Sequence, residues 1–237
     1  MTEERVKEIF SKARAVITDT HVVYASWRHG KVYVNKDAIY PHVGLIAELC
    51  GDMIAPFCVA AFGVESVGVD FDTIVGPEKG GIILSQWAAY NSVHVRELGK
   101  DIYAVYAEKE TVAIPDPEGK ERKCFAETGR FVFNRGYVDF VRDKRVLVVE
   151  DVLTTGTSAR KTVEAVRVVG GEVIGVSALC NRGGVTKEDV GDVPKLTALL
   201  NVRLETWAEE ECSMCKQGVP INTQVGKGRE YLARKGK

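Results

Sequence analysis

The stretch RVLVVEDVLTTGTS, residues 145–158, decides the fold of this chain. Its apolar, β-branched first part, residues 145–149, predicts a short strand that is buried on both faces. Two adjacent carboxylates, Glu150 and Asp151, come next, followed by a turn rich in hydroxyl groups. A helical pattern then covers residues 159–169 and stops at two glycines. The sequence therefore predicts a strand, an acidic turn and a helix in direct succession.

The turn between this strand and this helix has the composition of a phosphate site. Its members are Thr154, Thr155, Gly156, Thr157 and Ser158. A helix start offers unpaired N–H groups and a partial positive charge, which together suit one phosphate monoester. The two carboxylates would repel that phosphate, so we expect them to bind sugar hydroxyls or a Mg2+ ion that shields a polyphosphate. Phosphoribosyl pyrophosphate (PRPP) has all three parts.

A strand, an acidic turn and a helix are also common in α/β proteins, and most such turns bind nothing. The full string is more specific, because it resembles the PRPP signature of the type I phosphoribosyltransferases almost letter for letter. It is not a Walker A loop, because Ile82 and Ile83 stand where Lys and Ser or Thr must follow the glycines. The resemblance implies an α/β fold of the type I phosphoribosyltransferase kind, with a mainly parallel central sheet flanked by helices and a small N-terminal hood.

Composition narrows the class of protein. The 237 residues carry a formal net charge of −1, so no global field favours nucleic acid or an anionic membrane. We interpret the basic residues 227–237 as a solvated terminus. Six cysteines occur in a chain without an apolar export segment, which predicts reduced thiols and a cytoplasmic location. The most apolar long segment, residues 43–64, contains two carboxylates and is typical of a packed helix, so we expect no membrane span.

The remaining pattern predicts strands and helices in alternation. The predicted helices cover residues 3–15, 41–62 and 80–99, and the predicted strands cover residues 22–25, 31–35 (around a turn at 28–30), 72–75, 102–107 and 173–179. This order implies right-handed crossovers and a parallel sheet whose ligands gather at the carboxyl ends of the strands. The polar stretch around residues 110–129 is too long for an ordinary connection and predicts a hairpin or a lid.

Three other strand ends are expected beside the phosphate turn. The family keeps its pyrophosphate loop at the glycine-rich segment VGPEKGG, residues 75–81, which implies this role for Lys79 and Gly80. The segment YAEK, residues 106–109, resembles the Phe-Ala-Glu-Arg segment of orotate phosphoribosyltransferases, so Lys109 is a candidate ligand of the diphosphate. The family shows Asp-Arg where this chain has Asn181 and Arg182, and that arginine holds the orotate carboxylate. Arg182 is therefore expected to bind orotate beside Thr154.

The resemblance covers nearly the whole chain. Residues 16–35 have the layout of the family's hood, and the segment FNRGY, residues 133–137, is similar to Leu-Arg-Arg-Gly-Phe and adds Arg135 as a PRPP ligand. The resemblance implies a hood segment at residues 1–40, a core at 41–200 with a lid at about 108–136, and an extension at 201–237 that belongs to the hood or packs on the core. It also implies a homodimer, because the family's lids often reach the neighbouring subunit's site. The usual Lys-x-His-Gly lid motif is missing, and residues 112–123 look inserted.

Two metals were considered. Mg2+ is the expected cofactor, held by Glu150 and Asp151 largely through water. Cys212 and Cys215 form a Cys-x-x-Cys pair, but zinc needs four ligands and the sequence offers no second such pair. We interpret the pair as a reduced structural motif, similar to the family's Cys-Pro-Leu-Cys tail. The four histidines, His21, His29, His42 and His94, show no metal-ligand spacing and are interpreted as structural or exposed.

These observations predict a Mg2+-dependent orotate phosphoribosyltransferase that makes orotidine 5′-phosphate and pyrophosphate, a step of pyrimidine biosynthesis. Asp151, Glu150 and Lys109 are the candidate catalytic residues. Orotate is already an anion, so no strong general base is required. One alternative is a purine-salvage or other-base phosphoribosyltransferase, which Asn181 and the altered lid leave open. The other is a non-catalytic, PRPP-sensing regulator that binds nucleic acid, which only the basic tail favours.

Overall fold

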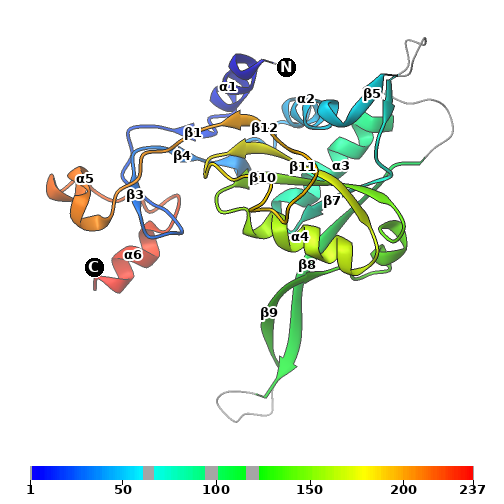
Figure 1. Cartoon of the computed structure of the whole chain (residues 1–237). Helices are drawn as coiled ribbons and strands as arrows, with labels where there is room; N and C mark the ends of the chain where they lie inside the picture. The colour runs from blue at the N-terminus through cyan, green and yellow to red at the C-terminus, as the bar shows by residue number, and fades with distance from the viewer. Residues whose placement is uncertain (1, 61–66, 94–100, 116–122, 237) are drawn as a thin grey trace. The chain divides into compact units, whose positions relative to one another are not determined.

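A six-stranded sheet organises the middle of the chain (Figure 1). The computed structural model describes residues 2–60, 67–93, 101–115 and 123–236. The sheet has the order β12-β11-β10-β7-β8-β9, and each neighbouring pair is parallel except the β8–β9 hairpin. Its strands are β7 (Thr73–Pro77), β8 (Tyr103–Ile114), β9 (Cys124–Val132), β10 (Arg145–Leu153), β11 (Glu172–Asn181) and β12 (Leu196–Asn201). This architecture confirms the predicted α/β fold with a mainly parallel sheet.

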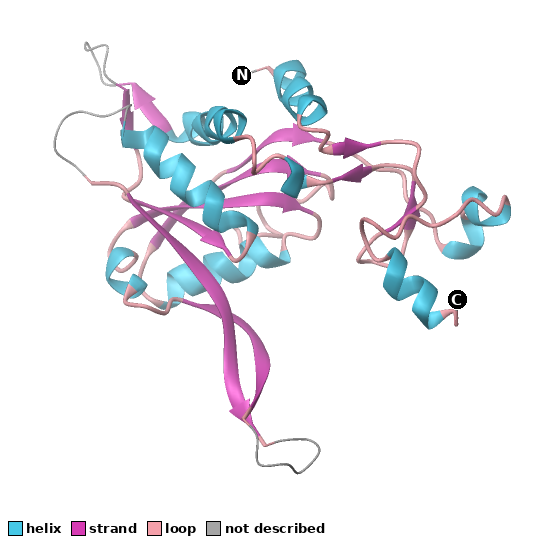
Figure 2. Cartoon of the chain, turned by 180° about the vertical axis from the view of Figure 1, so that it is seen from behind, coloured by secondary structure: helices cyan, strands magenta, loops and turns pink. Residues whose placement is uncertain are grey.

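Helices cover both faces of this sheet. They are α2 (Val43–Ile54), α3 (Gly80–Val93) and α4 (Thr157–Val168). α3 leads from β7 to β8 and α4 leads from β10 to β11, in opposite directions along the sheet, so right-handed crossovers place them on opposite faces. Figures 1 and 2, which view the molecule from opposite sides, show α4 in front of the strands in the first view and α3 in front in the second. α2 lies near α3, because Asn91 Nδ2 donates to the Ala47 carbonyl at 2.8 Å.

The core of residues 46–201 forms where the apolar strands meet these helices. Residues 146–149 of β10 are fully buried, as expected of a central strand in a parallel sheet. Val163 and Val166 from α4 pack into the same cluster. At the sheet edge, β8 continues beyond its parallel partner β7 and pairs with β9, and this hairpin projects away from the sheet (Figure 1). The carboxyl ends of β10, β7 and β8 are therefore neighbours.

The chain divides into two compact units, of which the sheet belongs to Ile46–Asn201. The other unit combines Met1–Leu45 with Val202–Lys237. Its elements are α1 (Glu3–Lys12), β1 (Val16–Ile17), β2 (Val22–Val23), β3 (His29–Gly30), β4 (Tyr33–Val34), α5 (Ser213–Lys216), α6 (Gly228–Arg234) and 3-10 turns at Lys36–Ala38 and Glu209–Glu211. β1 pairs with β4 and β2 with β3, both antiparallel. We call this part the terminal unit.

Backbone contacts join the two ends of the chain within the terminal unit. His29 and Trp207 exchange two backbone hydrogen bonds, at 2.8 and 2.9 Å. Asn222 N donates to the His21 carbonyl at 2.8 Å, and Lys227 N donates to the Val23 carbonyl at 2.7 Å. The short strands β2 and β3 are thus held by the C-terminal segment as well as by each other.

Several predicted boundaries were wrong. The helix predicted over residues 41–62 ends at Ile54, because Pro56 disfavours helical geometry at the residue before it. It is followed by a 3-10 turn (Ala55–Phe57) and by the strand β5 (Cys58–Ala60), which pairs with β6 (Val67–Val69). The predicted turn at residues 28–30 includes the strand β3, and β8 is longer than predicted. The strand β12 was not predicted. Residues 61–66, 94–100 and 116–122 lie outside the described residues. The C-terminal boundary predicted at residue 99 for the third helix is therefore not described, and neither is part of the predicted lid.

Candidate active site

The predicted phosphate turn connects β10 to α4 at the carboxyl edge of the sheet. The strand is longer than predicted and includes Glu150 and Asp151, so the carboxylates belong to its last residues and not to the turn. The turn follows with Thr154 and Thr155 exposed, and α4 begins at Thr157. Gly156 adopts a φ of 73°, which only glycine reaches without strain, and this residue reverses the chain into the helix.

A small hollow of about 130 Å³ lies in this turn. It is lined by Glu150, Val152, Leu153 and residues 154–159. The Thr155 and Thr157 hydroxyls lie 2.8 Å apart, so the polar lining of the hollow is already ordered by its own hydrogen bond. The first turn of a twelve-residue helix faces the same place and contributes a partial positive charge. The hollow thus combines hydroxyl donors with a helix N-terminus, which is the chemistry of a phosphate site.

The loop after β11 fits closely against the phosphate turn. Arg182 N and Gly183 N both donate to the Leu153 carbonyl, at 3.0 and 3.2 Å. A Cβ atom on Gly183 would lie 1.8 Å from the Thr154 carbonyl oxygen, so any other residue would push the two segments apart. A Cβ on Gly156 would lie 2.9 Å from the Val185 side chain. The turn is therefore held in place by direct backbone packing against residues 182–185.

The two carboxylates differ in their placement. Glu150 and Asp151 retain 6% and 4% of their exposure, so both are buried acids. Successive side chains of a strand point to opposite faces, and Glu150 is the only carboxylate among the described residues that line the hollow. Glu150 Oε1 accepts from Asp151 N at 3.0 Å, and Asp151 Oδ1 accepts from Val152 N at 2.6 Å. Carboxylate oxygens are the ligands that Mg2+ prefers, so Glu150, which lines the hollow, has the donor type for a magnesium ion or its hydration shell.

Arg182 and Thr154, both expected to bind orotate, are in contact. Arg182 Nε donates to Thr154 Oγ1 at 3.0 Å, which fixes the guanidinium beside the phosphate turn. The neighbouring Asn181 closes its own loop, since its Nδ2 donates to the Val185 carbonyl at 2.8 Å and its Oδ1 accepts from Val185 N at 3.0 Å. An aspartate could accept from Val185 N but could not donate to the carbonyl. The departure from Asp-Arg therefore has a structural use in this chain.

The loop between β7 and α3 holds Lys79 and Gly80. Gly76 and Gly81 pack backbone to backbone, and a Cβ on Gly76 would lie 2.0 Å from the Gly81 carbonyl oxygen. Glu78 N donates to the Ala107 carbonyl at 2.9 Å, and the Glu78–Lys79 peptide bond is cis. The Lys79 side chain is exposed. The loop is thus tied to β8, and its lysine is accessible to an anion.

Lys109 lies in β8, one strand away from that loop. Its backbone N donates to Glu78 Oε1 at 3.2 Å, and its ammonium pairs with Glu127 Oε1 of β9 at 2.9 Å. The hydrogen bond and charge of Glu127 raise the pKa of Lys109 above its ordinary value. In this conformation the lysine therefore joins the two strands of the hairpin, and binding a diphosphate requires it to leave Glu127 or to share its charge.

Glu108 is a site residue that the sequence analysis missed. Its carboxylate accepts from Asn134 Nδ2 at 2.8 Å and pairs with Arg135 Nη2 at 3.5 Å. The charges of Tyr106 and Glu108 raise the pKa of Arg135, which keeps the guanidinium protonated. Arg135 has a φ of 60°, so this residue sits in a tight turn that Glu108 helps to hold. An acid directly before Lys109 was visible in the sequence, but its partners are 26 and 27 residues away.

A second group of reactive side chains lies in the terminal unit. His21, His29, Cys212 and Cys215 present ligand atoms that all lie within 4.8 Å of one another. The sequence analysis did not predict this cluster, because the two histidines and the two cysteines come from opposite ends of the chain. No helix among the described residues is both long and apolar enough to cross a membrane.

Comparisons with known proteins place this site in a family. The model of the phosphoribosyl transferase domain family matches residues 60–207. An orotate phosphoribosyltransferase of Caldanaerobacter subterraneus subsp. tengcongensis is 32% identical over 93% of this chain and 96% of its own length. One from Pelotomaculum thermopropionicum is 32% identical over 93% of this chain and 95% of its own.

A solved structure agrees with this placement at the level of the fold. The crystal structure of Mycobacterium tuberculosis H37Rv orotate phosphoribosyltransferase in complex with PRPP superposes with a TM-score of 0.52. It is 22% identical, and the match covers 84% of this chain and 96% of that one.

Proposed function

We infer the reaction from one premise: this chain belongs to the phosphoribosyltransferase family and, within it, to the orotate phosphoribosyltransferases. We propose that it transfers ribose 5-phosphate from PRPP to orotate, forming orotidine 5′-phosphate and pyrophosphate. The observation that carries this proposal is the hydroxyl-lined hollow at the start of α4, with the Arg182 guanidinium held beside it by Thr154.

The hollow is proposed to hold the 5-phosphate of PRPP. Hydroxyls and N–H groups of residues 154–158 would donate to the phosphate oxygens, and the N-terminus of α4 would favour the negative charge. Glu150, which lines the hollow, would accept hydrogen bonds from the ribose hydroxyls. Asp151, buried next to it, would assist by fixing the strand end and the charge of the site.

Glu150 and Asp151 are also proposed to hold Mg2+, in large part through water. When bound, the ion supplies positive charge that offsets the diphosphate of PRPP. The protein's own cations would supply the rest. Lys79 is exposed in the loop after β7, Lys109 follows in β8, and Arg135 is held near that strand by Glu108. Losing one well-placed charged donor of this kind typically costs about a hundred- to a thousandfold in turnover.

Arg182 is proposed to position orotate. A guanidinium matches a planar carboxylate through a rigid fork of donors. As the ring nitrogen bonds to the anomeric carbon, the bond from that carbon to pyrophosphate breaks. The proton of the ring nitrogen would pass to water or to the leaving pyrophosphate, so no strong base on the protein is required. The transition state of such glycosyl transfer is oxocarbenium-like, so the protein must align the reactants, exclude water and stabilise the leaving pyrophosphate. The residues named above are proposed to align the reactants and to stabilise the leaving pyrophosphate.

The β8–β9 hairpin is proposed as the lid, and the enzyme as a homodimer in the cytoplasm. Val112 and Phe125 are 46% and 62% exposed on this hairpin, and exposed apolar side chains on a projecting element favour contact with another surface. Six free cysteines support a reducing compartment. Residues 1–40 are proposed to form a hood segment, and residues 201–237 are proposed to be an extension that belongs to it. Sedimentation velocity measures the oligomeric state directly.

A panel of bases tests the proposed reaction. With PRPP and Mg2+, orotate should be consumed and orotidine 5′-phosphate should form, while adenine, hypoxanthine and uracil should not react. Arg182→Ala should lower the use of orotate much more than it lowers PRPP binding, and chelation of Mg2+ should stop the reaction. Reaction with a purine in place of orotate would refute the assigned base, and salt-sensitive binding of RNA or DNA without any transfer would refute the enzyme assignment.

A further inference from the structure

Four potential metal ligands converge in the terminal unit, from opposite ends of the chain. His21 precedes β2, His29 lies in β3, and Cys212 and Cys215 flank the start of α5. His21 and Cys212 are 191 positions apart, yet the His21 Nε2 and Cys212 Sγ atoms lie 3.6 Å from each other. Three of the four residues are buried, and Cys215 is half-buried. The cluster is therefore assembled by the fold and not by sequence proximity.

The separations of these atoms match a tetrahedron around one metal ion. Zinc binds nitrogen at about 2.05 Å and sulfur at about 2.3 Å, which in a regular tetrahedron gives about 3.3 Å between two nitrogens and about 3.6 Å between nitrogen and sulfur. His21 Nε2 lies 3.6 Å from each sulfur and 2.9 Å from His29 Nδ1, and His29 Nδ1 lies 3.3 Å from Cys215 Sγ. These four separations lie close to the values that a bound zinc imposes, and all the ligand atoms lie within 4.8 Å of one another.

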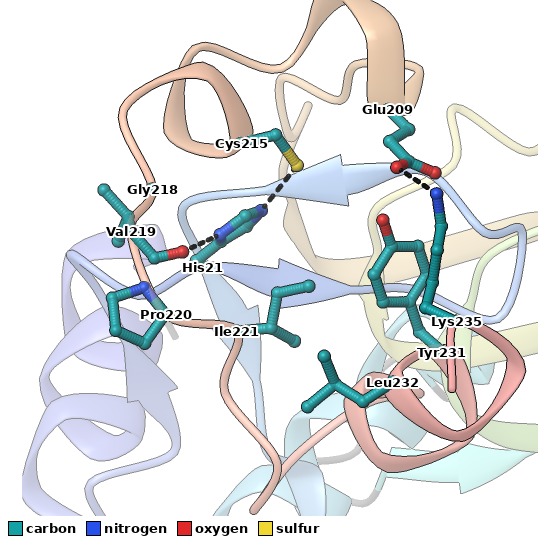
Figure 3. Close-up of a pocket in the computed structure, with 10 residues that line it drawn as sticks. All are labelled: His21, Glu209, Cys215, Gly218, Val219, Pro220, Ile221, Tyr231, Leu232 and Lys235. Atoms are coloured by element: carbon teal, nitrogen blue, oxygen red, sulfur yellow. Dashed lines mark hydrogen bonds and ion pairs between the residues drawn. The ribbon is translucent and has the colours of Figure 1, made fainter. Parts of the chain in front are cut away.

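Hydrogen bonding prepares His21 as a ligand. Its Nδ1 lies 2.8 Å from the Val219 carbonyl, which can only accept, so Nδ1 carries the proton and Nε2 presents a lone pair to the cluster (Figure 3). A carbonyl on the far nitrogen is the usual outer partner of a metal-bound histidine. The ring of His29 is oriented by packing, since the Tyr231 ring meets it edge-on at 5.1 Å between centroids.

Without a cation, His29 has no satisfactory protonation state. If its Nδ1 carries the proton, it donates to His21 Nε2, but then its buried Nε2 is an acceptor without a partner. If Nε2 carries the proton, two nitrogen lone pairs face each other at 2.9 Å. His29 Nε2 is the one buried side-chain nitrogen or oxygen without a hydrogen-bond partner among the described residues. A cation between the two rings removes the repulsion between the facing lone pairs and makes His29 Nδ1 a ligand, with the proton on Nε2. The close approach of the two ring nitrogens, and not the unpartnered Nε2, is therefore the observation that favours a cation.

We propose that the terminal unit binds one zinc ion through His21 Nε2, His29 Nδ1, Cys212 Sγ and Cys215 Sγ. Two thiolates and two imidazoles are the donor set of structural zinc, whereas Mg2+ takes oxygen ligands. Four protein ligands close the coordination shell, so this zinc has no open position for catalysis. Its role is to join the β2–β3 pair to the segment that carries α5. Strands of two residues gain little from their own hydrogen bonds, which makes such a cross-link valuable.

The structure also provides a route to this site. A cavity of about 310 Å³ opens beside it, and His21 and Cys215 are among its lining residues (Figure 3). Glu209 and Lys235 form an ion pair at 2.6 Å on another side of the same cavity. A hydrated ion can therefore reach the ligands without unfolding of the terminal unit.

Metal analysis of the purified chain tests the proposal. Protein prepared without added metal should contain close to one zinc per chain by mass spectrometry of the elements. Replacement by Co2+ should give the visible absorption of a tetrahedral site and the ultraviolet charge-transfer band of thiolate ligands. Removal of zinc by a strong chelator should lower the melting temperature, and zinc but not Mg2+ should restore it.

Variants separate the ligands from other cysteines and histidines. Cys215→Ser and His29→Asn should each lose most of the bound zinc, whereas Cys58→Ser and His42→Asn, which lie outside the cluster, should keep it. The cobalt spectrum of the unmodified chain decides the matter if the ligand variants do not fold. Chains that contain no zinc, that take up cobalt without the thiolate band, or that hold Cys212 and Cys215 as a disulfide after purification under reducing conditions would overturn the proposal.

Discussion

Thr154→Val tests whether the phosphate turn also positions the base. The substitution keeps the shape of the side chain and removes the hydroxyl that accepts from Arg182 Nε at 3.0 Å. If Arg182 holds the orotate carboxylate, the loss of this hydrogen bond leaves the Arg182 side chain less ordered before orotate binds. Orotate binding must then order that side chain, which weakens the binding of orotate. The variant should therefore raise the KM for orotate by more than it raises the KM for PRPP, because the other hydroxyls and N–H groups of the turn still face the phosphate hollow.

The size of the effect follows from the exposure of the pair. A hydrogen bond to a charged group contributes about 1.5–3 kcal/mol when water is excluded. Thr154 is exposed and Arg182 is half-buried, so water replaces part of the lost bond. We therefore expect a loss of about 1–1.5 kcal/mol, which corresponds to about a five- to tenfold higher KM for orotate.

Steady-state kinetics with each substrate varied in turn measures this difference. Thr197→Val is the matched control, because it removes a hydroxyl that donates to Ser177 Oγ at 3.1 Å in β12, outside the site. It should leave both KM values unchanged. A KM for orotate within about twofold of the unmodified enzyme in Thr154→Val, together with a large increase in Arg182→Ala, would show that Arg182 does not depend on Thr154.

Three further outcomes follow from the same structure. Gly183→Ala places a Cβ 1.8 Å from the Thr154 carbonyl oxygen, so it should abolish most of the PRPP-induced rise in melting temperature; an undiminished rise would contradict the packing of the two segments. Asn181→Asp removes the donor to the Val185 carbonyl and should lower the free energy of unfolding by about 1–3 kcal/mol in urea titrations. Hydrogen bonds from Thr128 and Arg130 lower the pKa of Glu110 below the ordinary glutamate value. The stability that Glu110 gives to the hairpin should therefore be fully present above the ordinary glutamate pKa and should be lost as the pH falls through the lowered pKa. Carboxyl NMR titration and amide exchange of the hairpin, measured between neutral and acidic pH, check this sign.

The strand, turn and helix around the phosphate site were predictable because their signals are local. The apolar run of β10, the glycine at position 156 and the hydroxyls around it each act within a few residues of the chain. Contact between Arg182 and Thr154 was also within reach, since parallel strands bring their carboxyl ends to one edge. The error in this region was small: the strand extends through both carboxylates, because continued pairing with β11 outweighs the preference of charged residues for a turn.

Pairing across long distances explains most of the remaining errors. His29 and Gly30 were interpreted as turn residues, and their local composition supports that interpretation. They form a strand because they pair with Val22 and Val23 of β2, and His29 also exchanges backbone hydrogen bonds with Trp207 from the other end of the chain, which no local pattern reports. Glu108 was overlooked for the same reason, since its role comes from Asn134 and the arginine that follows it.

The cysteine pair shows how a rule about spacing along the chain can miss ligands that only the fold brings together. Zinc does need four ligands, and a second pair of ligands does not follow Cys212 and Cys215 at any ordinary spacing. In our proposal the other two ligands are His21, which directly precedes β2, and His29, which lies in the paired strand β3. These strands are so short that their register depends on the C-terminal segment, and in our proposal that segment is held to them by the metal. In our proposal the fold brings the four ligands together, and the bound metal in turn holds that part of the fold. A search for ligand spacing along the sequence could therefore not identify this site.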